Sequence, residues 1–401
     1  MSLKVAIVGA GLGGLAAALF LRQRGFAVSV HEQSSAFNEI GAGIIVPPNM
    51  VRPLRRLGLA DQLGAFAVKV EYAWEFRRWQ DGRVIATTPM GEACESLYGA
   101  PCYVAHRADL RAMLRRALPD DVVHLGQRCV GLSQTNAGVA LEFVSADGRR
   151  TRIEADAAIG ADGIHSVVRN AVAEQQPPRF SGLCAFRCLV PAERAPDMAR
   201  RPVHTVWLGP GRHFVHYPIS AGRQVNIVAI APAGDWRSES WTADGEVSDL
   251  LAEFATWDER LRHLIISATQ TKRWAMFDRA PLDRWTKGRV TLLGDAAHAM
   301  LPFLAQGAAQ GVEDAEALAD CLAGATAGSI ELALKRYEDL RRPRANQVLL
   351  GSRGREIRNH LPDGPEQEKR DAELAATDPL KQIAWLYGEG GERPAGAAAP
   401  H

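Results

Sequence analysis

The N-terminal βαβ pattern constrains the fold of this chain more than any other feature of its sequence. Lys4–Val8 is a short apolar run of the kind that forms a buried strand, and it leads directly into GAGLGG at residues 9–14. A helical run rich in Ala and Leu follows, and residues 28–30 predict a second strand that ends in Glu32. This order of strand, glycines, helix, strand and acidic residue is typical of a Rossmann-type dinucleotide-binding unit.

Each position of this fingerprint has a physical role. Gly9, Gly11 and Gly14 permit the tight turn, the close approach of backbone to a pyrophosphate and close helix–strand packing. The N-terminus of the helix faces the diphosphate. Glu32 stands where it accepts the ribose hydroxyls, and an acid there favours an unphosphorylated adenosine ribose. The fingerprint does not distinguish FAD from NAD.

Length and charge limit the class of protein. A chain of 401 residues is too long for one small core, so we expect two lobes. Its formal net charge of +1 predicts no attraction to nucleic acid and no polybasic membrane footprint. No apolar run approaches the roughly 20 residues that span a bilayer, and the N-terminus lacks a cleavage region, so we expect a cytoplasmic protein. The 6 scattered cysteines predict reduced thiols and no metal site.

Strand patterns indicate a second lobe. Tyr72, Trp74 and Phe76 alternate with smaller or charged residues, which is the period of a strand. Further strands are predicted at 184–190, 203–208, 213–218 and 225–230. We therefore predict an α/β fold with a Rossmann-type domain (1–70, 101–179 and 276–370) interleaved with a mostly antiparallel β-sheet domain for the substrate (71–100 and 180–275). C-terminal helices at 330–342 and 347–358 precede a terminal segment, 371–401.

Two later segments repeat the sequence of strand, loop and helix. GADGIHSVVR, residues 160–169, follows a predicted strand at 157–159. In the segment 289–320 an apolar run stops at Gly294-Asp295, and a loop leads into a helix from about Ala309. Such loops, at the carboxyl ends of buried strands, are where α/β proteins bind ligands. Arg107, after a strand and at the start of a helix, is a candidate anion ligand.

The three motifs together resemble the single-component, FAD-dependent aromatic hydroxylases, the p-hydroxybenzoate hydroxylase-like flavoprotein monooxygenases, over nearly the whole chain. The resemblance implies FAD, with its ADP half on the first motif, Asp162 near both FAD and the nicotinamide, and Asp295 on the ribitol hydroxyls. One departure is Ala299 after His298, where the family usually has Pro. As in the family, no second glycine fingerprint exists for NADH or NADPH, which would bind transiently.

The resemblance also implies how the loop at 301–308 meets the cofactor. This loop would lie against the isoalloxazine ring, and the N-terminus of the following helix would stabilise negative charge on the reduced flavin. The positions implied to bind FAD are Gly9, Gly11, Gly13, Gly14, Leu15, Glu32, Gly43, Arg107, Asp162, Gly294, Asp295, Pro302, Gln306, Gly307 and Ala308.

The substrate residues are expected in RHFVHYPI, residues 212–219. In the family a flavin C4a-hydroperoxide attacks an electron-rich ring, and a base that ionises the ring hydroxyl is useful. On a strand His213 and Tyr217 share one face, while His216 points the other way. We therefore expect His213 as base or phenolate partner and Tyr217 as the residue that positions the ring. His298 is expected to be structural.

The resemblance implies a small monocyclic hydroxy-aromatic acid, with salicylate as the leading example. LPFLAQGAA is similar to the salicylate and hydroxynicotinate hydroxylases, and the Trp-Leu-Tyr sequence at 385–387 is similar to the hydroxynicotinate enzymes. Hydroxylation of 6-hydroxynicotinate or 3-hydroxybenzoate, a flavin-dependent reductase or oxidase, and a flavin-binding sensor without turnover remain alternatives. O2 and NAD(P)H are the expected co-substrates, and a homodimer is an expectation from the family.

Overall fold

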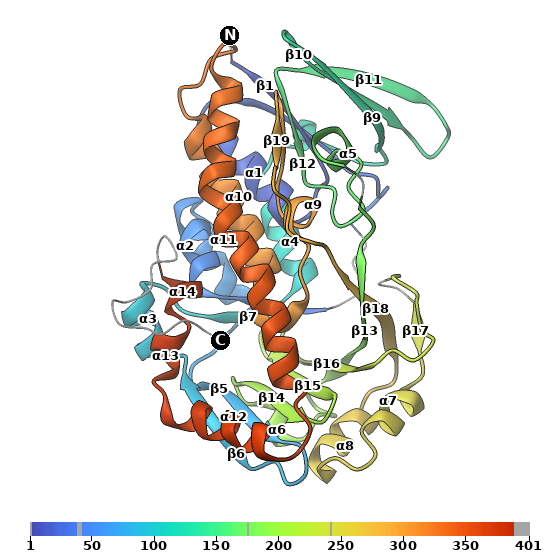
Figure 1. Cartoon of the computed structure of the whole chain (residues 1–401), viewed down its shortest axis with the longest axis vertical. Helices are drawn as coiled ribbons and strands as arrows, with labels where there is room; N and C mark the ends of the chain where they lie inside the picture. The colour runs from blue at the N-terminus through green and yellow to red at the C-terminus, as the bar shows by residue number, and fades with distance from the viewer. Residues whose placement is uncertain (1, 38–41, 175, 241–242, 389–401) are drawn as a thin grey trace. The chain divides into compact units, whose positions relative to one another are not determined.

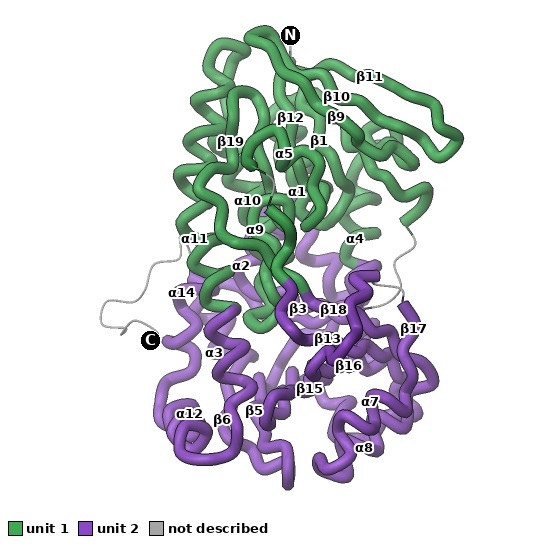
Figure 2. Tube along the Cα trace, turned by 45° about the vertical axis from the view of Figure 1, so that its right-hand side comes forward, with its two compact units in different colours: residues 1–38, 110–179, 277–352 green, residues 39–109, 180–276, 353–401 purple. Residues whose placement is uncertain are grey.

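The computed structural model describes residues 2–37, 42–174, 176–240 and 243–388, and the chain forms two compact units (Figure 1, Figure 2). Unit 1 comprises residues 1–38, 110–179 and 277–352. Unit 2 comprises residues 39–109, 180–276 and 353–401. No helix among the described residues is both long enough and apolar enough to cross a membrane.

Unit 1 is built on a six-stranded sheet in the order β19-β20-β12-β1-β2-β8. The strands are β1 (Lys4–Val8), β2 (Ala27–His31), β8 (Val123–His124), β12 (Ala157–Gly160), β19 (Thr286–Lys287) and β20 (Val290–Leu292). All neighbours pair in parallel except β19 with β20. The central strands are buried apolar runs, as expected for a parallel sheet with both faces covered. The predicted Rossmann-type unit is confirmed.

Helices α1 (Leu12–Gln23) and α10 (Gly307–Leu322) lie side by side in unit 1. Glycines make the close approach between them: a Cβ on Gly13 would lie 3.3 Å from the carbonyl oxygen of Gly311. A second, antiparallel sheet holds β9 (Arg128–Thr135), β10 (Gly138–Val144) and β11 (Arg150–Ala155).

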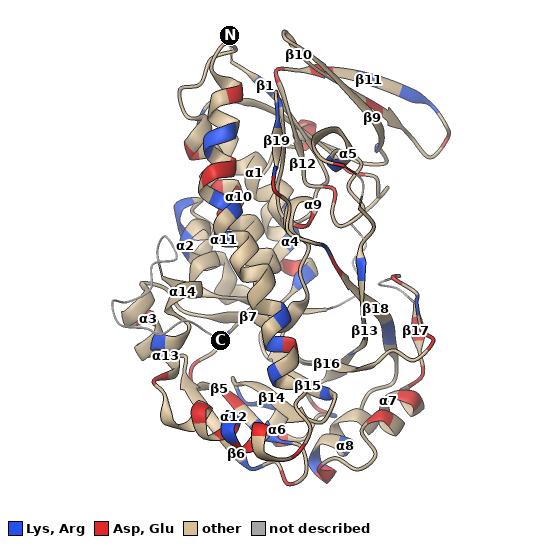
Figure 3. Cartoon of the chain, viewed as in Figure 1, with Lys and Arg blue, Asp and Glu red and all other residues tan. Residues whose placement is uncertain are grey.

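The C-terminal helical region differs from the sequence expectation. Helices were predicted at 330–342 and 347–358, but one helix, α11 (Ile330–Asn359), runs through Pro343. Proline costs an interior hydrogen bond, yet Tyr337 before it and Val348 after it are both fully buried. Tertiary packing on both sides of Pro343 therefore keeps the helix continuous. Acidic and basic residues interleave along α11 (Figure 3).

Unit 2 contains an eight-stranded sheet in the order β17-β18-β13-β16-β15-β14-β5-β6. Its strands are β5 (Ala73–Arg78), β6 (Val84–Pro89), β13 (Arg179–Pro191), β14 (His204–Gly209), β15 (Arg212–Ile219), β16 (Gln224–Pro232), β17 (Asp244–Gly245) and β18 (Thr271–Asp278). The pairing is mostly antiparallel, with β14 and β5 parallel. Helices α7 (Val247–Glu253) and α8 (Glu259–Ile266) cover one face, where Trp207, Phe214 and Phe254 form the core.

A small sheet of β3 (Gly43–Val46), β7 (Tyr103–His106) and β4 (Val68–Lys69) completes the strands of unit 2. The longer of the remaining helices are α2 (Pro48–Arg56), α3 (Glu92–Tyr98), α4 (Arg107–Arg116) and α12 (Pro365–Ala376). One-turn helices are α5 (Arg169–Val172), α6 (Asp197–Arg200), α9 (Asp295–His298), α13 (Pro379–Gln382) and α14 (Ala384–Tyr387), with 3₁₀ turns η1 (Ala60–Ala65), η2 (Asp120–Val122) and η3 (Pro302–Leu304).

The compact units and the predicted domains divide the chain differently. Residues 39–70, 101–109 and 353–370 were predicted in the dinucleotide-binding domain, whereas the compact division groups them with the large sheet. A physical link is the Gly43 N–H, which donates to Asn226 Oδ1 of β16 at 2.7 Å. Which segments serve FAD and which serve the substrate stays a prediction.

Candidate functional site

The three sequence motifs of unit 1 meet at one edge of its main sheet. They follow β1, β12 and β20, which are neighbouring parallel strands, so their loops leave the sheet together. Gly9 has a φ of +104°, and a Cβ there would lie 2.3 Å from the carbonyl oxygen of Ala161. A Cβ on Gly14 would lie 2.1 Å from the carbonyl oxygen of Gly9. These two glycines are therefore required by the packing of the loops against each other.

Gly11 differs from its neighbours because it borders open space. A Cβ at this position would meet no described atom within 4 Å. Gly11 is also the N-cap of α1, and no side chain caps that end of the helix. The first backbone N–H groups of an α-helix have no intrahelical partner, and with the helix dipole they favour an anion. This edge of unit 1 fits the pyrophosphate of a dinucleotide.

Glu32 holds the glycine turn. Its carboxylate accepts the N–H of Ala10 and the N–H of Ser34, each at 2.9 Å. Arg111, which the sequence reasoning missed, donates from Nε to the carbonyl oxygen of Ala10 at 2.9 Å, with its Nη2 3.6 Å from Glu32. Each carboxylate oxygen has a second lone pair, so Glu32 can still accept a ribose hydroxyl, which is the role predicted for it.

Asp295 opens α9 and is exposed, although the residues on both sides of it are buried. Among the described residues its carboxylate has no hydrogen-bond partner, so its oxygens are available to a ligand. Gly294 before it has a φ of +60°, and Gly307 at the start of α10 lies beside its carboxylate. An unpaired carboxylate at the carboxyl end of β20 fits the ribitol hydroxyls of FAD.

Asp314 of α10 stabilises the turn at Gly294. It is another residue that the sequence reasoning missed. Asp314 Oδ2 accepts the Gly294 N–H at 3.1 Å and contacts His298 Nε2 at 2.6 Å, while Oδ1 accepts Arg341 Nε at 2.7 Å. All these side chains are buried. Burial opposes ionisation of Asp314, but the charges of His298 and Arg341 outweigh it and lower its pKa to about 2. His298 thus has the structural contacts that were expected.

The N-terminus of α10 lies at Gly307, close to the predicted start at Ala309. Gln306 is its N-cap and contributes no side-chain cap, so the first N–H groups, from Gly307 and Ala308 on, are not capped by a side chain. Pro302 before it is exposed on η3, and Ala305 has a φ of +53°. This helix end can stabilise negative charge on a bound ligand.

Asp162 is used within its own loop. Its carboxylate accepts hydrogen bonds from Ser166 Oγ at 2.5 Å and from the N–H groups of Val167 and Val168 at 2.7 and 3.2 Å. Burial raises the pKa of Asp162. Arg169 ties this loop to α9, because its Nη1 donates to the carbonyl oxygen of Ala296 at 3.0 Å. The Asp162 side chain orders the loop, and its predicted contact with cofactor remains a prediction.

Gly43 and Arg107 belong to unit 2. A Cβ on Gly43 would lie 2.4 Å from Asn226 Cγ and 2.6 Å from Tyr217 Cε2, so only glycine fits there. Arg107 is the first residue of α4, as expected, and its N–H donates to the carbonyl oxygen of Ala42 at 2.9 Å. Their predicted contacts with FAD remain predictions.

The expected substrate strand is β15, and its two faces divide as predicted. Phe214 and His216 point to the face covered by α7 and α8, and Tyr217 points to the other, where its ring stacks on His204 at 5.2 Å. Burial raises the pKa of Tyr217, so the phenol keeps its proton.

His213 pairs with a residue that the sequence reasoning did not find. Its Nδ1 lies 2.7 Å from Nε2 of His360, and burial lowers the pKa of both imidazoles, that of His360 to about 4. His213 is therefore neutral at physiological pH. It lies about 13 Å along β15 from Tyr217, four residues away at roughly 3.3 Å each.

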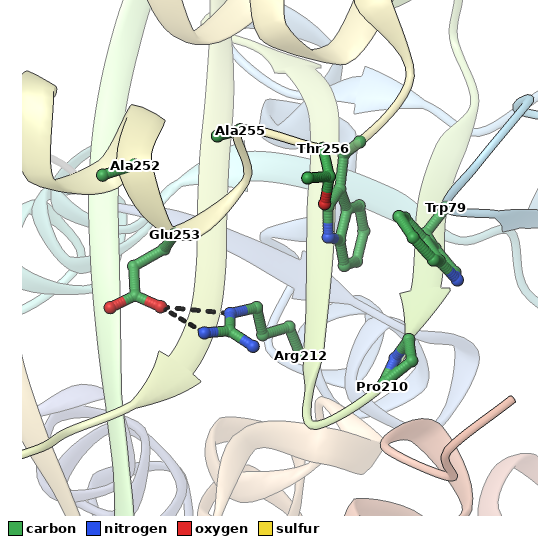
Figure 4. A pocket seen from close by; sticks show the side chains of 8 residues that line it. Trp79, Pro210, Arg212, Ala252, Glu253, Ala255 and Thr256 are labelled. Carbon is green, nitrogen blue, oxygen red and sulfur yellow. Dashed lines mark hydrogen bonds and ion pairs between the residues drawn. The ribbon is translucent and has the colours of Figure 1, made fainter.

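A hollow of about 270 Å³ in unit 2 is lined by neither His213 nor Tyr217 (Figure 4). Trp79, Trp257 and Arg212 line it, and Arg212 donates from Nε and Nη2 to Glu253 Oε2 at 3.0 and 2.7 Å. Because the Glu253 carboxylate already neutralises Arg212, this hollow offers little positive charge for an aromatic acid.

Comparisons with known proteins agree with this geometry. A profile of the FAD binding domain family matches residues 2–352. The chain is 44% identical to a 3-amino-4-hydroxybenzoate 2-monooxygenase of Streptomyces cremeus, over 96% of this chain and 95% of that protein. It is 36% identical to a 6-hydroxynicotinate 3-monooxygenase of Pseudomonas fluorescens, over 86% and 89%. A salicylate hydroxylase–substrate complex superposes with a TM-score of 0.80 at 29% identity, covering 99% of each chain.

The chain therefore belongs to the FAD binding domain family, within the branch of the aromatic hydroxylases. It is an FAD-dependent monooxygenase, with NAD(P)H as the co-substrate typical of these enzymes. The resemblance that the three motifs indicated is confirmed.

Proposed function

We propose that this enzyme hydroxylates a small hydroxy-aromatic acid of the 3-amino-4-hydroxybenzoate type. In the overall reaction the aromatic acid, O2, NAD(P)H and a proton give the hydroxylated acid, NAD(P)⁺ and water. The observation that carries this substrate class is the 44% identity to a 3-amino-4-hydroxybenzoate 2-monooxygenase over 96% of the chain. Salicylate, the leading example from the sequence, has weaker support, because a salicylate hydroxylase of Pseudomonas putida is 35% identical over 87% of this chain and the salicylate hydroxylase structure shares 29% identity.

The residues of unit 1 would hold and orient FAD, which when bound supplies the redox chemistry that activates O2. The uncapped N-terminus of α1 at Gly11 would bind the pyrophosphate, Glu32 the adenosine ribose and Asp295 the ribitol. The N-terminus of α10 at Gly307 would stabilise negative charge on the pyrimidine edge of the reduced ring.

In unit 2 the proposed substrate residues are Tyr217 and His213. Because burial raises the pKa of Tyr217, its hydroxyl is a hydrogen-bond donor that can position an oxygen of the ring. His213 is held neutral, with Nδ1 against His360. A neutral imidazole can accept a proton from the ring hydroxyl, but its lowered pKa makes it a weak base. We therefore propose positioning as the main role of both residues.

The test is the absorption spectrum of the purified protein, followed by NADH and NADPH oxidation with a panel of acids. The panel contains 3-amino-4-hydroxybenzoate, salicylate, 6-hydroxynicotinate and 3-hydroxybenzoate. We expect a yellow protein whose NAD(P)H oxidation is stimulated most by 3-amino-4-hydroxybenzoate, with a product heavier by one oxygen atom. Light scattering on the same sample checks the homodimer expected from the family.

Each alternative has its own signature in this experiment. NAD(P)H oxidation with no hydroxylated product from any acid would indicate a reductase or oxidase on the same scaffold. Bound FAD without stimulated oxidation would support a sensor. A colourless protein that FAD cannot reconstitute would overturn the proposal.

A further inference from the structure

One row of side chains crosses the large sheet of unit 2 on the face that carries Tyr217. Trp74 of β5 lies directly opposite His204 of β14, and Tyr217 of β15 lies opposite Asn226 of β16. Continuing the β14–β15 register places Tyr217 opposite His204, and their rings stack at 5.2 Å. Residues paired across neighbouring strands share a face, so the four side chains stand next to one another.

Three of these four side chains carry a buried polar atom without a hydrogen-bond partner among the described residues. These atoms are Trp74 Nε1, His204 Nδ1 and Asn226 Nδ2. The orientation of Asn226 follows from Gly43, whose N–H donates to Oδ1, so Nδ2 is the unused donor. Buried polar atoms in folded proteins are nearly always paired, so three unpaired atoms side by side in one row can be satisfied together by a bound ligand.

The row is also uncharged. Burial lowers the pKa of His204 to about 3 and raises the pKa of Tyr217, so neither ring carries charge at neutral pH. Trp74 and Asn226 can only donate through their unused groups, whereas a neutral imidazole nitrogen can accept. Aromatic rings dominate the row, and Tyr387 adds its ring edge-on to Trp74 at 6.1 Å. This chemistry suits a flat ring with oxygen acceptors and one donor substituent.

The opposite face of the same sheet supplies a matched comparison. His216 is as buried as His204, its pKa is also lowered to about 3 by burial, and both its ring nitrogens lack partners among the described residues. Its neighbour there is Phe214, which belongs to the apolar core under α7 and α8. His216 therefore shares the burial of His204 but lies outside the row: Thr205 of β14 lies opposite it, and the charge of Arg77 also lowers its pKa.

We propose that the row of Trp74, His204, Tyr217 and Asn226 is the surface of unit 2 that selects the aromatic substrate by its substituents. Trp74 and Asn226 donate to the oxygens of the ring acid, and His204 Nδ1 accepts a hydrogen bond from an amino or hydroxyl group on the ring. This assignment rests on the proposed function and identifies the residues that would set its specificity.

The experiment measures dissociation constants on the FAD-loaded protein from the change in the flavin absorption spectrum. The ligands are 3-amino-4-hydroxybenzoate and 4-hydroxybenzoate, which differ by the amino group alone. We expect the wild type to bind the amino compound at least about tenfold more tightly, since a site built to hydrogen-bond a substituent rejects the analogue that lacks it. In the His204→Leu variant the ratio of the two dissociation constants should fall close to 1. His216→Leu, the matched control, should leave this ratio unchanged.

A second variant tests the donors separately. Trp74→Phe removes an N–H while keeping a ring. It should therefore weaken the binding of both ligands about tenfold and leave the ratio of their dissociation constants unchanged. FAD content and the melting midpoint of each variant establish that it is folded.

The outcomes separate this inference from the proposed function. If the wild type binds and hydroxylates these acids but a folded His204→Leu variant keeps the ratio, the assignment of the row is wrong and the proposed function stands. The same holds if His216→Leu loses the ratio equally, or if the wild type shows no preference. If the FAD-loaded wild type binds and oxidises no aromatic acid, both fail.

Discussion

At the residue scale, Asp314 determines how firmly the Asp295 loop is held. It joins Gly294, His298 and Arg341 through hydrogen bonds inside a fully buried cluster. Asp314→Asn removes one of two carboxylates that contact the buried Arg341, because Glu313 contacts Arg341 Nη1 at 2.6 Å. A hydrogen bond to a charged group contributes about 1.5–3 kcal/mol, so we expect the free energy of unfolding to fall by about that amount, with weaker FAD binding, measured by calorimetry and by flavin fluorescence titration.

The matched control for this change is Asp320→Asn on the same helix, because the Asp320 side chain is 54% exposed in its pair with Arg24. Exposed pairs contribute about 0–1 kcal/mol, so that variant should behave like the wild type. Equal stability of the two variants would show that Asp314 does not hold the loop.

At the scale of the element, two glycines at the start of α1, the N-cap Gly11 and Gly14, differ in the space that surrounds them. Gly14→Ala would place a Cβ 2.1 Å from the Gly9 carbonyl oxygen and should abolish folding of unit 1. Gly11→Ala meets open space and needs no positive φ, so the protein should fold normally. Its methyl group would stand where the pyrophosphate approaches, and we expect FAD affinity to fall by about tenfold or more.

Circular dichroism and FAD titration of both variants check this expectation. Unimpaired FAD binding by Gly11→Ala would place the pyrophosphate elsewhere, and a stable Gly14→Ala variant would contradict the close packing of β1 and α1.

At the scale of the whole molecule, FAD should stabilise the folded chain by mass action. A ligand that binds only the folded state at 100 times its dissociation constant adds about 2.7 kcal/mol. We expect the calorimetric melting midpoint to rise with FAD concentration, and FMN, which lacks the adenosine half that α1 and Glu32 would bind, to give a smaller shift at equal concentration. Equal shifts would contradict the assigned role of the GAGLGG motif.

Buried histidines should make unit 2 sensitive to acid. Burial lowers the pKa of His204 and His216 to about 3 and of His360 to about 4, from an ordinary 6.5. The unfolded chain therefore binds more protons below pH 6.5, so stability is full above that pH and falls as pH drops toward 4. His216→Leu should flatten this slope of the unfolding free energy by up to one proton. An unchanged slope in that variant would mean that His216 is not held neutral.

Much of the site in unit 1 could be predicted because its signals are local. The turn of Gly9 and Gly14, the acid at Glu32 and the change from strand to helix at Gly294 each depend on a few neighbouring residues. Arg111, Asp314 and Arg341 could not be found this way. They act on residues that are distant in sequence, and a charged residue on an amphipathic helix has the same local pattern whether it is buried or solvated.

In unit 2 the alternation of β15 predicted which residues share a face, but not which partners they meet. His213 pairs with His360 at a separation of 147 residues, and His204 and Trp74 come beside Tyr217 through strand order alone. The sequence alone determined the Rossmann-type unit and the strand periodicity, because backbone sterics and hydrophobic periodicity are local, while the FAD cofactor followed from the resemblance of its three motifs to a family. Only the tertiary structure decided the continuous α11, the burial that sets the protonation of the histidines and the polar row on the large sheet, because desolvation and cross-strand contact depend on residues that folding brings together.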